Sequence, residues 1–129
     1  MLAIDSNVLV RYVVGDGGGE FDRAVHVIEN NPVWIALTVV LETEWVLRDV
    51  YEFPRIEVLS TLERLFGLST VSVAEPLVVG RAMRLAQSGM DLADALHVAQ
   101  APEKATFVTF DKALVKRGPR HAGLALKLA

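Results

Sequence analysis

The chain has 129 residues, 52% of them hydrophobic, with 13 Lys and Arg against 16 Asp and Glu. This composition excludes an intrinsically disordered protein, because disorder needs low hydrophobicity and high net charge. The absence of cysteine excludes a disulfide framework and a thiolate metal site, so any metal would need oxygen or histidine ligands.

Short apolar segments alternate with amphipathic helical segments along the chain. The predicted strands are 2–4, 33–37, 70–73, 106–110 and 124–128. The predicted helices are 7–14, 20–30, 38–51, 54–66, 76–87, 91–101 and 112–117. Asp5 or Ser6 is expected to cap the first helix and Thr38 the third. The alternation predicts a single α/β domain over residues 1–129, with helices covering a parallel sheet and a site beyond the carboxyl ends of the strands.

Two features of the sequence bear on where the protein is found in the cell. The longest nearly apolar run, residues 33–41, is far shorter than the roughly 20 residues that a membrane helix needs. The first five residues lack the basic flank of a signal peptide. We therefore expect a cytoplasmic protein that does not associate with a membrane.

Charge is unevenly distributed. Residues 1–111 have a balance of −8, whereas residues 112–129 carry five basic residues and no acid. These basic residues are Lys112, Lys116, Arg117, Arg120 and Lys127. The segment fits a phosphate-binding rim or a solvated terminal segment, and the charge pattern favours neither.

Two carboxylates directly follow predicted strands. Asp5 follows the first strand and Asp111 the fourth, so both are expected at the site-bearing edge of the sheet. Capping of the next helix is the structural alternative for each of them.

A second carboxylate pair lies on one predicted helix. Asp91 and Asp94 are three residues apart and so share a face, near Ala95 and Val98. Carboxylates on an inward face are costly unless a cation compensates them. Asp91 could instead cap the helix. Asp94 is expected inside the helix, where Asp has poor propensity, so it is harder to explain structurally.

Glu42 and Glu44 lie on the helix that follows the second strand. They flank its apolar face on opposite sides, so helical periodicity does not choose between them. Glu42 is nearer to the carboxyl end of the strand, which favours it for a site. A solvated surface position is the alternative for both.

Together these acids favour a hard cation. Mg²⁺ and Mn²⁺ prefer oxygen ligands of the kind that these acids would offer. The acids are Asp5, one glutamate, Asp94 with Asp91, and Asp111. The histidines do not show ligand spacing, and His97 is expected on the helix surface, although it lies three residues from Asp94.

Four segments resemble the motifs of one family. Residues 2–12, LAIDSNVLVRY, resemble the opening of PIN-domain ribonucleases, the class that includes VapC-type toxins. Residues 40–47 (VLETEWVL), 91–97 (DLADALH) and 107–111 (FVTFD) resemble the second, third and fourth motifs. The four occur in the family's order and together span nearly the whole chain.

The resemblance implies a three-layer α/β sandwich with about five parallel strands in the order 3-2-1-4-5. It implies a Mg²⁺- or Mn²⁺-dependent endoribonuclease, the toxin of a toxin–antitoxin pair, whose products carry 5′-phosphate and 3′-hydroxyl ends. The implied partners are RNA, a cognate antitoxin protein and a second copy of the chain. The apolar helices within 39–66 also allow a homodimer.

The resemblance also assigns roles to residues, and it favours Glu42 over Glu44 as the glutamate of the site, which helical periodicity does not. The implied catalytic and metal-binding acids are Asp5, Glu42, Asp94 and Asp111. Asp91 is implied as an accompanying acid. Asn7 and Thr109 are implied as supporting polar residues. An acidic cleft repels RNA, so basic residues are needed at its rim. The candidates are Arg11, Arg48, Lys112, Lys116 and Arg117.

Two other functions stay open from the sequence. One is a phosphatase or phosphotransferase with Asp5 as nucleophile, although that chemistry usually wants a second Asp two residues on, where Asn7 stands. The other is a non-catalytic module of the same fold. Incubation with RNA and with a phosphate monoester, each with Mg²⁺ and with EDTA, discriminates between them.

Overall fold

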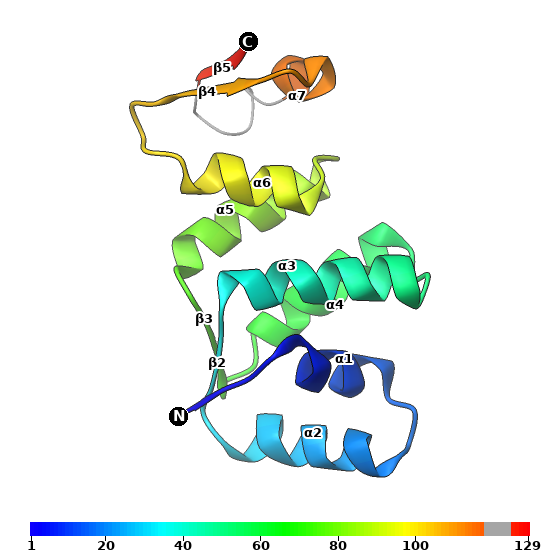
Figure 1. Cartoon of the computed structure of the whole chain (residues 1–129). Helices are drawn as coiled ribbons and strands as arrows, with labels where there is room; N and C mark the ends of the chain where they lie inside the picture. Colours follow the sequence, from blue (N-terminus) through cyan, green and yellow to red (C-terminus); the bar gives the residue numbers. More distant parts are fainter. Residues whose placement is uncertain (118–124) are drawn as a thin grey trace. The chain divides into compact units, whose positions relative to one another are not determined.

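The structure is a computed structural model that describes residues 1–117 and 125–129. Packing groups the chain into two compact units, Met1–Pro76 (unit 1) and Leu77–Ala129 (unit 2) (Figure 1). Three residues of the sequence predictions, Arg120, His121 and Leu124, lie outside the described residues.

Unit 1 contains a three-stranded parallel sheet with helices between its strands. Its elements are β1 (Leu2–Ala3), α1 (Ser6–Val14), α2 (Gly19–Asn30), β2 (Val33–Ile35), α3 (Leu37–Trp45), the π-helix η1 (Val46–Val50), α4 (Arg55–Phe66) and β3 (Val71–Val73). β2 is the central strand, because Val33 pairs with both Leu2 of β1 and Val71 of β3. The strand order 3-2-1 agrees with the expected order.

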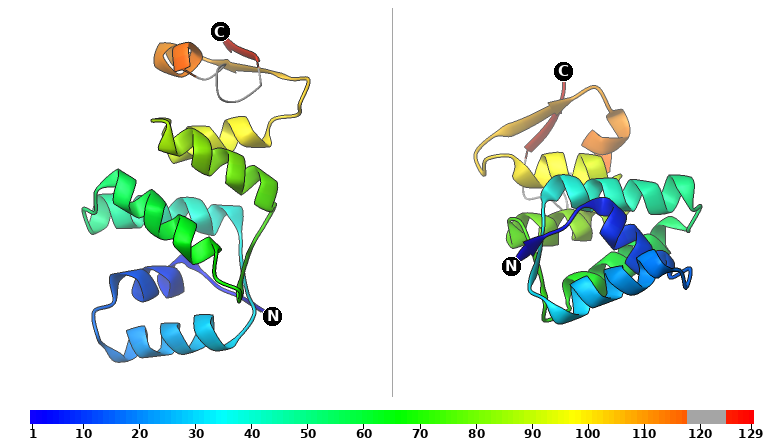
Figure 2. Two further views of the ribbon diagram at one scale, coloured as in Figure 1. Left: turned by 180° about the vertical axis from the view of Figure 1, so that it is seen from behind. Right: turned by 60° about the horizontal axis from the view of Figure 1, so that its bottom comes forward.

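The sheet and helices of unit 1 share one apolar core. On β2, Val33 and Ile35 are fully buried, whereas Trp34 between them is 37% exposed, as the two-residue period of a strand requires. The largest fully buried apolar side chains of this unit are Leu9, Ile28, Val33, Ile35, Val40, Leu47, Val58, Leu59 and Leu62. α2 folds back along α1 after a glycine-rich loop (Figure 2). Gly15 ends α1 in the left-handed conformation, and its N–H donates to the Arg11 carbonyl.

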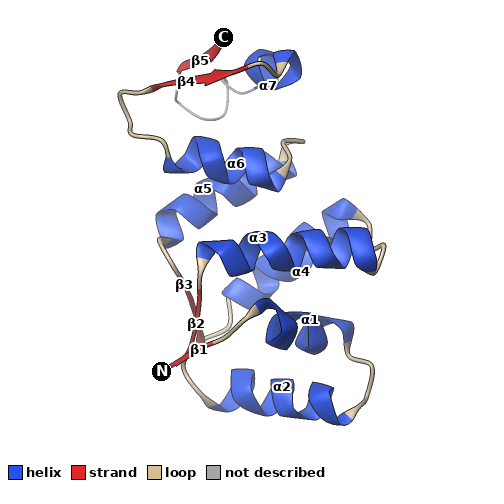
Figure 3. Cartoon of the chain, in the orientation of Figure 1, coloured by secondary structure: helices blue, strands red, loops and turns tan. Residues whose placement is uncertain are grey.

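Unit 2 pairs two helices with a two-stranded parallel sheet and a short final helix (Figure 3). Its elements are α5 (Pro76–Gln87, which begins at the last residue of unit 1), α6 (Leu92–Gln100), β4 (Thr106–Thr109), α7 (Lys112–Arg117) and β5 (Ala125–Leu128). β4 pairs with β5 from Thr106–Ala125 to Thr109–Leu128, in agreement with the expected neighbours 4 and 5. Each unit therefore has parallel strands joined by helices, the α/β class that the alternating pattern predicts.

The third predicted helix is corrected in two ways. Thr38 does not cap it: the helix begins at Leu37, and the Ala36 carbonyl accepts from the N–H groups of Val39 and Val40. The α-helix ends at Trp45 and continues as the π-helix, which Tyr51 closes by donating its N–H to the Val46 carbonyl. A π-turn inserts one residue per turn, and a helical period read from the sequence cannot detect it.

The position of Asp94 is also corrected. α6 begins at Leu92 and Asp91 is its N-cap, so Asp94 lies in the first turn and not in the helix interior. A carboxylate is favourable there, because the first turn carries the positive end of the helix dipole. Helix propensity is therefore no argument that Asp94 belongs to a site. That argument now depends on what surrounds its side chain.

Among the described residues, no helix combines the length and apolar character that crossing a membrane would take.

Candidate active site

Asp111 stands where β4 passes into α7. Its Oδ1 accepts hydrogen bonds from the N–H groups of Ala113 at 2.9 Å and Leu114 at 3.1 Å, so the carboxylate caps α7. Its own N–H donates to the Thr109 hydroxyl at 3.0 Å. Thr109 thus fixes the backbone from which the Asp111 carboxylate projects. The supporting role expected of Thr109 in a site stays a prediction.

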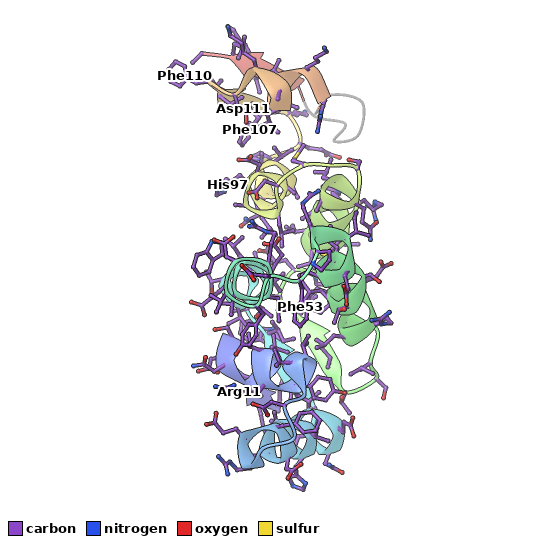
Figure 4. All side chains as sticks on the ribbon, turned by 90° about the vertical axis from the view of Figure 1, so that its right-hand side faces the viewer. Arg11, Phe53, His97, Phe107, Phe110 and Asp111 are labelled. Carbon is purple, nitrogen blue, oxygen red and sulfur yellow. The ribbon has the colours of Figure 1, made fainter. Side chains whose placement is uncertain are left out.

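The α5–α6 turn supplies two more carboxylates. Asp91 accepts from the Ala93 N–H through Oδ2 at 3.1 Å and so caps α6. Asp94, one turn further, is half-buried, while Ala95 and Val98 on the same helix are buried. The inward helix face expected from the sequence is therefore present, with Asp94 at its margin. His97 is exposed on α6 (Figure 4), as expected.

One pocket of unit 2 joins these three acids. It has a volume of about 140 Å³, and Asp91, Asp94 and Asp111 all contribute to its wall. The other lining residues are Gly89, Met90, Ala113, Leu114 and Arg117. The sequence prediction that Asp94 and Asp111 share a site with Asp91 thus has a geometric counterpart within unit 2.

The electrostatics of Asp94 reflect this gathering of like charges. Burial, and then the negative charges of Asp91 and Asp111, raise the pKa of the Asp94 carboxyl above its ordinary value, while His97 opposes the rise. The charged form of Asp94 is therefore disfavoured unless a cation enters the pocket.

The pocket residues suit a hard divalent cation by their chemistry. All three side chains offer carboxylate oxygens, and Mg²⁺ is usually bound through one or two carboxylates together with water and phosphate oxygens. Within residues 1–117 and 125–129, no three acidic or histidine side chains converge closely enough to hold an ion by themselves. An ion in this pocket would therefore complete its coordination with water or with a phosphate.

Unit 1 carries the other two predicted acids. Asp5 follows β1 and caps α1, accepting from the Val8 N–H at 3.2 Å. Glu42 on α3 is exposed and accepts a hydrogen bond from the buried Ser6 hydroxyl of α1. Ser6 directly follows Asp5 in the chain, so its hydrogen bond holds the Glu42 carboxylate near the residue that follows Asp5. The sequence prediction considered Ser6 only as a cap, because a contact 36 residues away leaves no local signal.

Glu44 differs sharply from Glu42. It is 2% exposed, and its Oε1 accepts from Arg48 Nε at 2.9 Å. The alternative expected for both glutamates, a solvated surface position, is wrong for Glu44, which is buried and paired with Arg48. Arg48 also contacts Asp49 at 3.2 Å, so this candidate RNA-binding residue is engaged by two carboxylates.

The remaining candidates lie in different surroundings. Arg11, shown in Figure 4, pairs with Glu20 at 3.2 Å and Asp16 at 3.5 Å. Together with Asn7 it lines a pocket of about 200 Å³ between α1 and α2.

The basic residues of α7 also differ from one another. Lys112, Lys116 and Arg117 are all exposed, but only Arg117 lines the acidic pocket.

Three carboxylates of an α/β fold thus meet in one pocket near the carboxyl end of β4, and carboxylate oxygens are ligands that divalent cations prefer. A family model described as the PIN domain matches residues 2–118, which cover nearly all of unit 1 and most of unit 2, and the chain belongs to the PIN-domain family. Proteins of this family are generally nucleases, and they typically bind divalent metal ions such as Mg²⁺. A search of the curated proteins gives no match.

Proposed function

We propose that this protein is a Mg²⁺- or Mn²⁺-dependent endoribonuclease. The observation that carries the proposal is the pocket of unit 2, where Asp91, Asp94 and Asp111 come together at a cost to the charged form of Asp94. Such a cost is expected where a cation is the ligand. Membership in a family of nucleases favours cleavage of a phosphodiester over the phosphatase alternative with Asp5 as nucleophile.

The acidic residues of the reaction are proposed to be Asp5, Glu42, Asp94 and Asp111, with Asp91 as an accompanying ligand. A bound divalent ion would lower the pKa of a water molecule and stabilise charge on the phosphate. Capping is compatible with this assignment, because the backbone N–H groups of α7 bond Oδ1 of Asp111 and not Oδ2. Thr109 and Ser6 would act as positioning residues, on Asp111 and Glu42 respectively. We propose Asn7 as a further polar support beside Asp5.

The test is cleavage of single-stranded RNA by the purified full chain. We expect cleavage with Mg²⁺ or Mn²⁺, no cleavage in EDTA and no requirement for Zn²⁺, because the proposed ligands are oxygens. Products should carry 5′-phosphate and 3′-hydroxyl ends. A phosphate monoester in a parallel reaction tests the phosphatase alternative. Cleavage that survives extensive dialysis against EDTA would refute the metal mechanism, and no cleavage under any condition would favour the non-catalytic module.

Glu42→Gln and Glu44→Gln form a matched pair of variants on one helix. Glu42 is exposed and held by Ser6, whereas Glu44 is buried and paired with Arg48. We expect Glu42→Gln to lose cleavage without losing stability, and Glu44→Gln to retain cleavage below its melting temperature. The reverse result would move the catalytic role to Glu44.

We further propose that the protein is the toxin of a toxin–antitoxin pair, active as a homodimer in the cytoplasm. The support is the likeness of four motifs, in order, to VapC-type toxins. Expression of the chain should arrest growth, and co-expression of a small protein encoded next to it should restore growth. Light scattering should give the mass of two chains. Normal growth on expression of a cleavage-competent chain would refute the toxin role.

A further inference from the structure

Arg117 stands apart from the other basic residues of its helix. It lies in the last turn of α7 and is the only basic side chain among the described residues that line the acidic pocket. Lys116, its neighbour in the chain, is exposed and does not line the pocket. The sequence treats these residues alike, as members of one basic segment, but the structure separates them.

The backbone at Gly89 makes room for the Arg117 guanidinium. A Cβ atom at Gly89 would lie 3.2 Å from Nη1 of Arg117, which is closer than such contacts normally come. Gly89 also has a φ of +116°, a conformation that residues with a side chain rarely adopt. A glycine in the α5–α6 turn therefore lets a guanidinium lie against the backbone at the pocket wall.

Arg117 lines the same pocket as the three acids. Within the described part of the chain, no ion pair of 4.0 Å or less joins Arg117 to Asp91, Asp94 or Asp111. The planar set of N–H donors of Arg117 is therefore not held by these three carboxylates. Phosphate oxygens match that geometry, because a guanidinium can donate two parallel hydrogen bonds to them.

We propose that Arg117 binds a phosphate of the RNA at the acidic pocket, where it opposes the metal ion until that phosphate arrives. The proposal deepens the endoribonuclease function and rests on it. Its physical basis is that a fixed positive charge beside a cation site weakens cation binding, whereas the same charge strengthens binding of an anion. Removal of Arg117 should therefore move metal affinity and RNA affinity in opposite directions. A purely structural role does not have this signature.

The experiment compares Arg117→Gln with the matched control Lys116→Gln, and uses Arg117→Lys to separate charge from geometry. Affinity for Mn²⁺ alone is measured by water-proton relaxation without RNA. Affinity for a short single-stranded RNA is measured by fluorescence anisotropy at two salt concentrations, with Ca²⁺ replacing Mg²⁺ to slow cleavage. Melting temperatures within about 2 °C of wild type establish that the variants are folded.

We expect Arg117→Gln to bind Mn²⁺ about threefold more tightly or better, since one opposing charge is gone. It should bind RNA about tenfold more weakly, as loss of a charge-assisted hydrogen bond implies. The slope of log affinity against log salt should fall by about one unit. Arg117→Lys should bind Mn²⁺ as wild type does and RNA with intermediate affinity. Lys116→Gln should leave the Mn²⁺ affinity unchanged and weaken RNA binding less than Arg117→Gln does, because Lys116 lies outside the pocket and its charge is screened by salt.

Equal effects of Arg117→Gln and Lys116→Gln on RNA binding would overturn the proposal, as would an unchanged Mn²⁺ affinity in Arg117→Gln. A wild-type chain that binds Mn²⁺ but neither binds nor cleaves RNA would refute the proposed function itself. In that case the Mn²⁺ comparison still reports whether the Arg117 charge acts on the pocket, so the two failures are distinguishable.

Discussion

The buried pair of Glu44 and Arg48 gives a prediction whose size follows from the structure. Glu44 is 2% exposed and bonds Arg48 Nε at 2.9 Å, while the Arg48 side chain is 30% exposed. Arg48→Met keeps much of the aliphatic packing but removes this partner from a buried carboxylate. Removing one partner of a buried ion pair costs about 3–5 kcal/mol.

Partial exposure of Arg48 lets water reach the pair, so we expect a smaller loss than for a fully buried pair, about 2–3 kcal/mol in the free energy of unfolding. For a chain of this length about 1 kcal/mol corresponds to roughly 4 °C, so the melting temperature should fall by about 8–12 °C. Glu44→Gln keeps the acceptor oxygen and removes the charge, so it should cost only about 1 kcal/mol. The double variant should be more stable than Arg48→Met alone, because the unpaired charge is gone.

Thermal and urea unfolding followed by circular dichroism measure all four proteins of this cycle. The reasoning is refuted if Arg48→Met melts within about 2 °C of wild type, because such a shift corresponds to a loss of about 0.5 kcal/mol or less in the free energy of unfolding. It is also refuted if the double variant is no more stable than Arg48→Met alone. The same samples, incubated with RNA at low temperature, show whether the pair contributes to cleavage apart from stability.

The remaining predictions concern the acidic residues. In EDTA at pH 7, Asp94→Asn should melt at or above the wild-type temperature, because a carboxyl with a raised pKa destabilises the fold once it is ionised. Protonated Asp94 stabilises the fold fully below the pKa that Asp94 has in the unfolded chain, and this stability is lost as the pH rises through its raised pKa in the folded protein. The higher melting temperature of Asp94→Asn relative to wild type should therefore shrink from pH 7 to pH 4. A difference that grows on acidification contradicts this sign. Mg²⁺ should raise the melting temperature of wild type more than that of Asp94→Asn, and equal shifts would remove Asp94 from the proposed ligands. Asp111→Ala should cost about 1 kcal/mol by loss of the α7 cap, whereas Asp111→Asn should keep the cap and both should lose RNA cleavage; equal melting temperatures of the two variants would argue against the cap.

Much of the fold could be predicted from local sequence signals. The helices 54–66 and 112–117 have the expected bounds to within a residue, because Pro54, Gly67 and Asp111 mark their ends. The predicted Thr38 cap is wrong because the helix begins sooner after β2 than expected. Ala36 is the residue before the helix, and its carbonyl accepts the first helical hydrogen bonds. The π-helix escaped prediction because nothing in a helical period marks an inserted residue.

The candidate site was predictable only in part. Asp91, Asp94 and Asp111 line one pocket as expected, since a helix face and a strand end can be read from the sequence. The burial of Glu44 depends on how α3 packs inside unit 1. Helical periodicity places Glu42 and Glu44 equally on the two sides of the apolar face, so it could not predict which of them is buried. The contact between Arg117 and the Gly89 turn joins residues far apart in the sequence, so a composition-based view could not separate Arg117 from Lys116.

Three of the acids that we propose as ligands also cap a helix; they are Asp5, Asp91 and Asp111. Asparagine caps a helix about as well as aspartate does. Aspartate and asparagine codons differ by a single base, so one point mutation at any of these positions leaves a folded protein without one of its charges. A gene that comes under selection to silence this activity could therefore do so without producing a chain that misfolds. Folded copies carrying Asn at a cap position are the form in which an inactivated descendant of this protein should first be found.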